Sequence, residues 1–169
     1  MPFLSTKTYP HSLGLSACFR QWNSTWSQDH FLHGYPLAFK IIFESDSLQR
    51  LRDMPELDEF IEVNFDHKVL VAQDDPKKEA FEALNDAMIA EVVVLPNVGP
   101  EAFAYQVFTF VEMMLETKGL FPNMRVHSVE CRLHSGLSGI YAREDDDDVF
   151  PYEPSMGDNI VEGDLHDDE

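Results

Sequence analysis

The sequence contains few cysteines, few basic residues and no long hydrophobic run. Its two cysteines, Cys18 and Cys131, form no CxxC motif, which excludes a disulfide scaffold and a cysteine-rich zinc module. Only 12 Lys and Arg residues stand against 31 Asp and Glu residues, a net charge of −19. This balance argues against nucleic acids and anionic membrane surfaces as partners, since both require clustered cations.

No apolar run approaches the roughly 20 residues of a membrane span. The first residues, MPFLSTKTYPHS, lack the basic start and long apolar middle of a signal peptide. We therefore expect a soluble, cytoplasmic protein. With 169 residues, 44% of them hydrophobic and 12% aromatic, the chain is long enough for one ordinary domain with a real core.

The negative charge is concentrated at the C-terminal end. Residues 144–169 hold 12 acidic residues and no Lys or Arg, which leaves residues 1–143 with a net charge of −7. Such a segment cannot bury enough surface to offset its ordering entropy. We expect a folded domain over 1–143 and a disordered acidic tail over 144–169, acting as a solubilising segment or as a docking segment for a basic partner.

Hydrophobic periodicity predicts a mixture of strands and helices. The predicted strands span residues 13–19, 37–43, 69–71, 91–95, 124–133 and 139–141. Helical spacing covers 46–64, with a break near Pro55, then 76–85 and 100–118, where Gly119 is a C-cap. Hairpin strands combined with helices on one face indicate an α+β sheet domain.

Five short motifs from about Thr6 to Tyr141 occur in a recognisable order. They are Gly14–Arg20 (GLSACFR), Phe31–Tyr35 (FLHGY), Phe65–Leu70 (FDHKVL), Gly99–Ala104 (GPEAFA) and the segment Val129–Tyr141. In this order they resemble the 6-pyruvoyl-tetrahydropterin synthase and 6-carboxytetrahydropterin synthase family. The resemblance implies the tunnelling fold, a four-stranded antiparallel sheet with two helices packed on one face. It also implies a homo-oligomeric ring, most simply a hexamer, with active sites at subunit interfaces.

The family holds zinc with three histidines, one on the first strand and two in a His-Gly-His at the second. Residues two apart in a strand face the same side, so His-x-His offers two imidazoles to one ion. In this sequence His33 matches the first histidine of that motif, but Tyr35 replaces the second and Phe19 replaces the first-strand histidine. The resemblance therefore implies a zinc cofactor, and these substitutions predict that it has been lost.

Other family positions are changed or kept. Asp29 stands where the family has its catalytic cysteine. Leu133 replaces a glutamate near the end of the family's domain that binds the amidine edge of the pterin with two hydrogen bonds. The catalytic pair is retained as Asp66 and His67, and Glu101 is retained as a candidate substrate-binding residue. Asp66 and His67 equally suit a structural turn, because such pairs often hold helix-to-strand junctions.

Three further interpretations concern nearby side chains. Asp29, His30 and His33 could hold a metal ion in a different geometry, or His30 could be a loop residue and His33 a hydrogen-bonded structural histidine. Asp29 is a poor replacement for the cysteine base, since an ordinary carboxyl pKa is only about 4. We expect Cys18 to pack in the core and Cys131 to be a small buried hydrophobe.

Three functions remain open. The first is a lyase of the tetrahydropterin-forming kind, acting on 7,8-dihydroneopterin triphosphate in pterin or queuosine-type 7-deazaguanine biosynthesis. The alternative is a catalytically inactive tunnelling-fold relative that serves in binding or assembly, which the coordinated substitutions favour. A third is a protein that binds a different purine-like ligand through Glu101.

Overall fold

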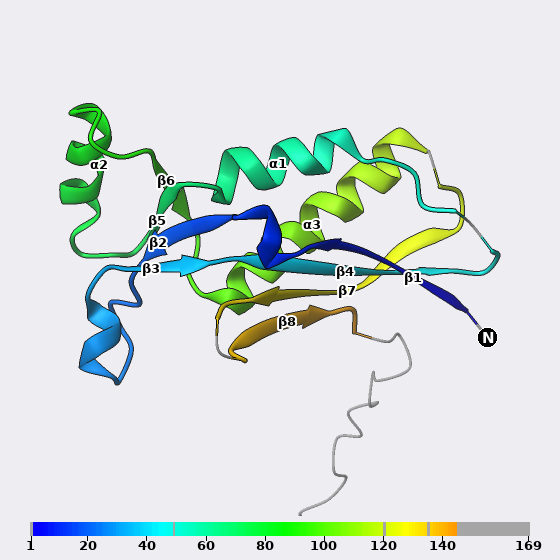
Figure 1. Ribbon diagram of the computed structural model, residues 1–169, viewed down its shortest axis with the longest axis horizontal. Helices are drawn as coiled ribbons and strands as arrows, with labels where there is room; N and C mark the ends of the chain where they lie inside the picture. The colour runs from blue at the N-terminus through cyan, green and yellow to red at the C-terminus, as the bar shows by residue number, and fades with distance from the viewer. Residues whose placement is uncertain (1, 49, 120, 135, 145–169) are drawn as a thin grey trace, which may run out of the picture.

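The computed structural model describes residues 2–48, 50–119, 121–134 and 136–144. The predicted acidic tail lies outside these residues, except for Glu144. Three helices and eight strands follow one another along the described chain (Figure 1). In order they are β1 (Phe3–Tyr9), β2 (Ser16–Phe19), β3 (His33–Pro36), β4 (Ala38–Ser45), α1 (Pro55–Phe65), β5 (Lys68–Ala72), α2 (Lys78–Asp86), β6 (Val92–Leu95), α3 (Pro100–Lys118), β7 (Met124–Arg132) and β8 (Ser138–Ala142).

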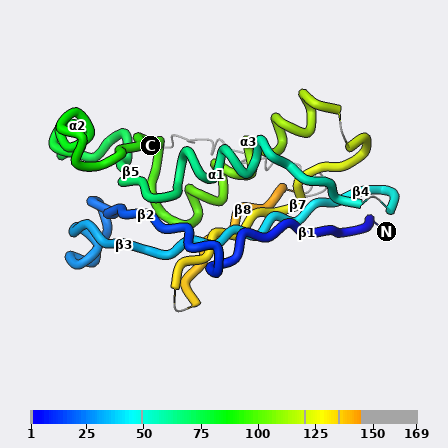
Figure 2. The backbone as a smooth tube through the Cα atoms, turned by 45° about the horizontal axis from the view of Figure 1, so that its top comes forward, coloured from blue at the N-terminus to red at the C-terminus, as the bar shows by residue number. Residues whose placement is uncertain are grey.

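The larger part of the molecule is an antiparallel sheet in the order β1-β4-β7-β8. Helices α1 and α3 run side by side across one face of this sheet, and neither helix crosses the other face (Figures 1 and 2). This arrangement confirms the predicted α+β architecture of four antiparallel strands with two helices on one face. The β4–β7 ladder contains a register shift between Ile42 and Phe43, which bends the sheet.

A second sheet, in the order β3-β2-β5-β6, corrects the expectation of a single sheet. The chain leaves β1 at Pro10, turns through Gly14 at φ +76°, and resumes as β2. On the partner strand Leu37 separates β3 from β4, and its N–H still bonds the carbonyl of Leu15. One long hairpin is thus divided into two ladders, and β5 and β6 extend the outer one in parallel.

Aromatic side chains join the two sheets to the helices. Phe103 on α3 lies 5.1 Å from Phe19 on β2 and 5.6 Å from Phe65 at the end of α1, measured between ring centroids. Phe65 in turn lies 5.2 Å from Phe39 on β4. These four rings are buried, and edge-on and tilted contacts of this kind add about 0.5–1.5 kcal/mol each beyond burial.

Several predicted elements have different boundaries in the structure. The helix predicted from residue 46 begins only at Pro55, because a proline is well tolerated at the first helical position and not inside a helix. Strand β1 was not predicted, since most of its side chains are exposed. The helix over 100–118, with Gly119 as its left-handed C-cap, is confirmed. Within the described residues, no helix is both long and apolar enough to cross a membrane.

A buried ion pair attaches the loop after β2 to the loop after β5. Arg20 Nε donates to Asp75 Oδ2 at 2.8 Å, and Arg20 Nη1 donates to the carbonyl of His30 at 3.1 Å. The Asp75 side chain is 1% exposed. Burial raises the pKa of Asp75, but the hydrogen bonds from Arg20 and from the Lys77 N–H outweigh burial, so its pKa lies below the ordinary value.

We predict that Asp75→Asn lowers the free energy of unfolding by about 2 kcal/mol at pH 7, because the buried carboxylate loses its charge-assisted hydrogen bonds from the half-buried Arg20 guanidinium. The folded-state pKa is depressed, so this contribution is complete above the ordinary Asp pKa of about 3.9 and disappears as the pH falls through the folded-state value. Urea unfolding of both proteins between neutral and acidic pH measures the difference. Asp74→Asn, at an exposed neighbour, is the matched control, and an equal loss there would contradict the assignment.

Candidate functional site

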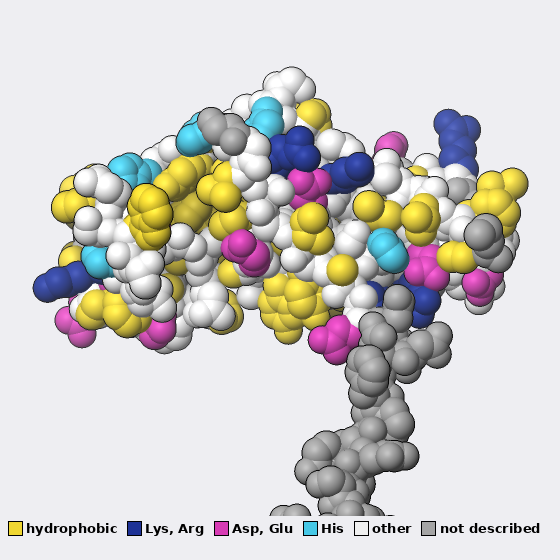
Figure 3. Space-filling model, turned by 90° about the horizontal axis from the view of Figure 1, so that it is seen from below, with side chains coloured by type: hydrophobic (Ala, Val, Ile, Leu, Met, Phe, Trp, Pro, Cys, Tyr) yellow, Lys and Arg dark blue, Asp and Glu magenta, His cyan; other side chains and the backbone are white. Residues whose placement is uncertain are grey.

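The candidate site lies where β2 and β3 meet the start of α3 and the turn between β7 and β8. Phe19 pairs with His33 across the β2–β3 ladder, and Ala17 pairs with Tyr35. The Tyr35 ring lies 4.6 Å from the Phe19 ring and stacks at 5.8 Å on the ring of His134. Viewed from the helix-free side, hydrophobic side chains gather around a hollow at the end of the molecule that carries β2 and β3 (Figure 3).

The three positions that the resemblance assigns to zinc ligands come together in the structure. His33 and Tyr35 lie two residues apart on β3, and Phe19 lies directly across from His33. Two of the three side chains are aromatic rings in contact with each other. The pKa of Tyr35 is raised by burial and by the nearby Asp29 carboxylate, so its phenol stays neutral and is a poor metal ligand. This donor set does not fit the family's zinc site.

The alternative set of Asp29, His30 and His33 is engaged within its own loop. His30 Nε2 lies 2.7 Å from the carbonyl of Ser24, and Ser24 Oγ donates to Asp29 at 2.7 Å. His33 Nε2 lies 3.0 Å from the carbonyl of Gln28. Within the part of the chain that the structure describes, no three His, Cys, Asp or Glu side chains are grouped as metal ligands. A metal at these residues stays a prediction.

Asp66 and His67 are brought into contact, as the catalytic interpretation requires. His67 Nδ1 lies 2.8 Å from Asp66 Oδ1, and the same oxygen accepts the N–H of Ser16 at 3.2 Å. His67 has φ +57°, and its N–H bonds the carbonyl of Ser16. The pair therefore holds the turn between α1 and β5 against the start of β2. The ring of His67 is 75% exposed. The geometry supports a structural role and leaves the imidazole accessible.

Glu101 is the second residue of α3 and is exposed at the helix start. Its carboxylate lies beside Gly99, and the side-chain amide of Gln21 reaches the same glycine from the loop after β2. A Cβ on Gly139 of β8 would stand 2.2 Å from the Glu101 backbone nitrogen, so only glycine lets β8 approach the helix start this closely. A carboxylate and an amide therefore converge beside Gly99 at the start of α3.

The two cysteines have different environments. Cys131 is buried, and burial first, then the charges of Glu101 and Glu130, raise the pKa of its thiol, so it is a packing residue and not a nucleophile. Leu133, beside it, is also buried. Cys18 is half-buried on the opposite side of β2 from Phe19, with its sulfur against Gly34. The prediction that Cys18 packs in the core is wrong, because strand alternation turns it outward.

Two residues of this site were not predicted from the sequence. Gln21 follows the first motif directly, and it reaches Gly99 only because the chain turns back after Arg20. His134 follows the last residues of β7, and its stack on Tyr35 depends on tertiary structure. Neither residue carries a spacing that signals a site, although both lie next to the motifs.

Comparisons with known proteins bear on the fold. No family model and no curated protein matches the sequence. Among solved structures, the uncharacterized protein WS1659 from Wolinella succinogenes superposes with a TM-score of 0.69 at 17% identity, covering 85% of this chain and 99% of that one. The chain has the tunnelling fold. A second solved structure, 6-pyruvoyl tetrahydropterin synthase of Plasmodium falciparum, gives a TM-score of 0.46 at 12% identity, covering 83% of this chain and 98% of that one.

In this tunnelling-fold protein the sheet and helices position the site residues, several of which differ from the motifs of the resembled family. The long hairpin brings Phe19, His33 and Tyr35 to one face, and α3, whose second residue is Glu101, contacts Phe19 through Phe103. The site thus consists of an aromatic floor with one carboxylate and one amide beside it. Such a surface suits a flat ring system that carries hydrogen-bond donors on one edge.

Proposed function

We propose that this protein is a tetrahydropterin synthase-like binding protein, which takes a flat pterin- or purine-like heterocycle without carrying out the zinc-dependent reaction. The contact between Phe19 and Tyr35, 4.6 Å between ring centroids, is the observation that carries the proposal. Phe103 packs behind Phe19 at 5.1 Å, so the ring at this position belongs to the core.

The proposed ligand contacts follow from the chemistry of the hollow. A carboxylate accepts two parallel hydrogen bonds from an amidine edge such as that of a 2-amino-pyrimidinone ring, and the proposal gives this role to Glu101, which is exposed at the start of α3. The Gln21 amide offers both a donor and an acceptor beside it. The stacked rings of Tyr35 and His134 provide an aromatic surface against which a flat heterocycle packs.

A second function is favoured by one observation, the contact between Asp66 and the exposed ring of His67. In this alternative the protein is a lyase of the 6-carboxytetrahydropterin synthase type that acts on 7,8-dihydroneopterin triphosphate. His67 would then move a proton and Asp66 would orient its ring. Consumption of that substrate by the wild type, abolished in His67→Ala, supports this alternative over the binding protein.

We predict that the purified protein holds no stoichiometric zinc, because a zinc site needs at least three protein ligands and two family positions are aromatic. The double variant Phe19→His and Tyr35→His, with His33, should gain about one zinc per chain. Elemental analysis after gel filtration measures both proteins, and Tyr35→His alone is the control with two imidazoles. About one tightly held zinc in the wild type would contradict the prediction and redirect attention to Asp29, His30 and His33.

We predict that the wild type quenches the fluorescence of a bound pterin such as neopterin, and that Glu101→Gln weakens this binding about 10- to 100-fold. The factor corresponds to the loss of a charge-assisted pair of hydrogen bonds. Glu116→Gln, an exposed acid farther along α3, changes the net charge equally and should leave the affinity unchanged. Equal losses in both variants would show that Glu101 does not contact the ligand.

We also predict a homo-oligomer, most simply a hexamer built from rings. Strands β1 and β8 are the two edges of the antiparallel sheet, and unpaired edges invite strand pairing. Both edges expose apolar side chains, namely Phe3, Leu4, Ile140 and Tyr141. Sedimentation velocity over micromolar concentrations measures the assembly, and a monomer throughout this range would contradict it.

A further inference from the structure

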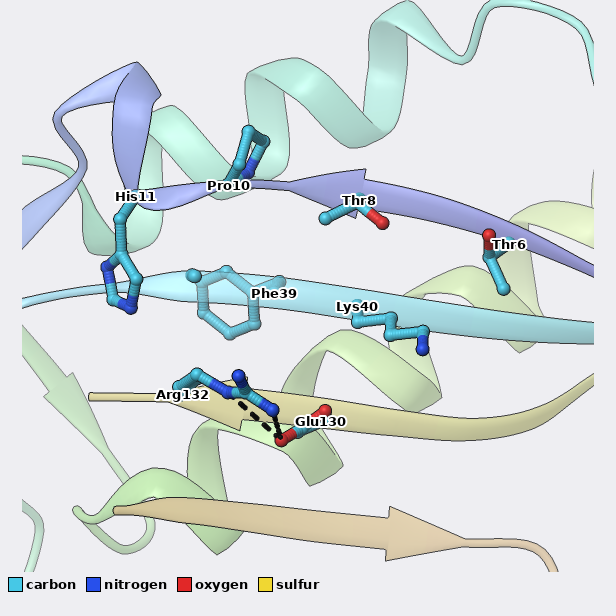
Figure 4. Close-up of a pocket in the computed structure, with 9 residues that line it drawn as sticks. Thr6, Thr8, Pro10, His11, Phe39, Lys40, Glu130 and Arg132 are labelled. Atoms are coloured by element: carbon cyan, nitrogen blue, oxygen red, sulfur yellow. Dashed lines mark hydrogen bonds and ion pairs between the residues drawn. The ribbon is translucent and has the colours of Figure 1, made fainter. Parts of the chain in front are cut away.

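The helix-free face of the antiparallel sheet contains a hollow of about 490 Å³, away from the candidate site. Its floor is Ala38, the small residue that pairs with Arg132 on β7. Thr8, Lys40 and Glu130 form the next row across β1, β4 and β7. His11 points from the turn after β1 toward Arg132 (Figure 4).

The charges around this hollow are mainly positive, in contrast to the acidic protein. Lys40, Arg132 and His11 stand around it with one acidic residue, Glu130. Arg132 Nη2 lies 2.9 Å from Glu130, and this hydrogen bond and its charge hold the pKa of Glu130 below its ordinary value. Glu130 is therefore ionised and already paired.

Lys40 is exposed and differs from most other cations of the protein. Across residues 2–48, 50–119, 121–134 and 136–144, its Nζ has no hydrogen bond or ion pair. By contrast, eight other Lys or Arg side chains are paired with carboxylates: Lys7, Arg20, Lys68, Lys78, Lys118, Arg125, Arg132 and Arg143. The charge of Lys40 does act on Glu130 and lowers its pKa, but Arg132 already bonds that carboxylate. Lys40 therefore has no carboxylate of its own in direct contact among the described residues, and it can still bind an added anionic group.

The start of the acidic tail is anchored on the same sheet. Arg143 Nε donates to the carbonyl of Val126 at 3.0 Å, its guanidinium pairs with Glu112, and its N–H bonds the carbonyl of His127. Ala142 pairs with Ser128, which pairs with Ile42, two residues from Lys40. The positions of Ala142 and Lys40 are thus about 12 Å apart, two strands across and two residues along.

We propose that the acidic tail of the same chain docks its carboxylates in this hollow, against Lys40 and Arg132. Each extended residue spans up to about 3.5 Å, so Asp145–Asp148 reach Lys40 even if the chain must first turn back. The hollow is net positive, and the tail carries 11 acids after Glu144 with no base. Because the two parts belong to one chain, their effective concentration is in the millimolar range, so several weak ionic contacts together can hold the tail without a separate binding partner.

Zero-length carbodiimide coupling of the full-length protein tests this proposal, since it joins an amine only to a carboxylate in direct contact. Peptide mapping should find Lys40 linked to tail carboxylates. Lys77, which is also exposed and has no ion pair among the described residues, should give little of this product. Mixing isotopically light and heavy chains separates links within one chain from links between copies. Links within one chain are expected, and links only between copies would overturn the assignment to the chain's own tail.

The yield of the Lys40 cross-link in variants and at raised salt distinguishes a docked tail from a tail that reaches Lys40 only by random collision. Replacing Asp145–Asp148 by Asn should reduce the Lys40 product and shift the backbone amide NMR signals of Thr8 and Lys40. Arg132→Gln should reduce the product about fivefold, as expected for one exposed ionic contact, whereas Lys77→Gln should leave it unchanged. Raising the salt from about 0.05 M to about 0.5 M should also reduce it. Equal coupling at Lys40 and Lys77, with no amide shifts in the Asn variant, would overturn the proposal.

Discussion

The structure depends on a continuous line of aromatic contacts that runs from the candidate site into the core. Tyr35 contacts Phe19, Phe19 contacts Phe103, Phe103 contacts Phe65, and Phe65 contacts Phe39. These rings come from both sheets and both helices of the main body, so they fix how the second sheet sits against the first. Since protein interiors are close-packed, a change in one ring is felt by its neighbours, and the site shares the stability of the core.

This continuity gives a physical reason for the differences between this chain and the family that its motifs resemble. Once an aromatic ring occupies the position of Phe19, the core extends into the metal position, and a histidine at the position of Tyr35 would lose its metal partner. Leu133 is likewise a core residue, since it is buried, as is Cys131 two positions before it on the chain. Asp66, His67 and Glu101, which match the motifs of the resembled family, lie outside the aromatic line, at a turn and at a helix start. The positions that differ from those motifs are thus the ones packed into the core.

The elements with strong local signals were predictable from the sequence. Strand β4 has an alternating buried pattern, and α3 has helical spacing, a proline at its start and a glycine after its end. The second sheet was not predictable in this way, because its parallel pairings join segments far apart in the chain and no local pattern encodes them. The residues of the candidate site also fall into a predictable group and an unpredictable group. The motif residues Phe19, Tyr35 and Glu101 were found, whereas Gln21 and His134 enter the site only through tertiary contacts.

Basic residues are scarce, and most of them form an ion pair with a carboxylate. Lys118 on α3 pairs with Glu56 on α1 at 2.7 Å, Lys7 on β1 pairs with Asp58 on α1 at 3.4 Å, and Arg20 joins the loops after β2 and β5. The exposed pairs contribute little individually, yet each joins segments far apart in sequence and offsets repulsion within an acidic body. Because most bases are committed to such contacts, the positive charge around Lys40 stands out electrostatically. Arg50, Arg52 and Lys77 also have no ion pair among the described residues, and of these four bases Lys40 is the one that lines the hollow on the helix-free face. The hollow therefore combines an uncommitted cation with a position on the sheet to which Arg143, just before the acidic segment, is bonded.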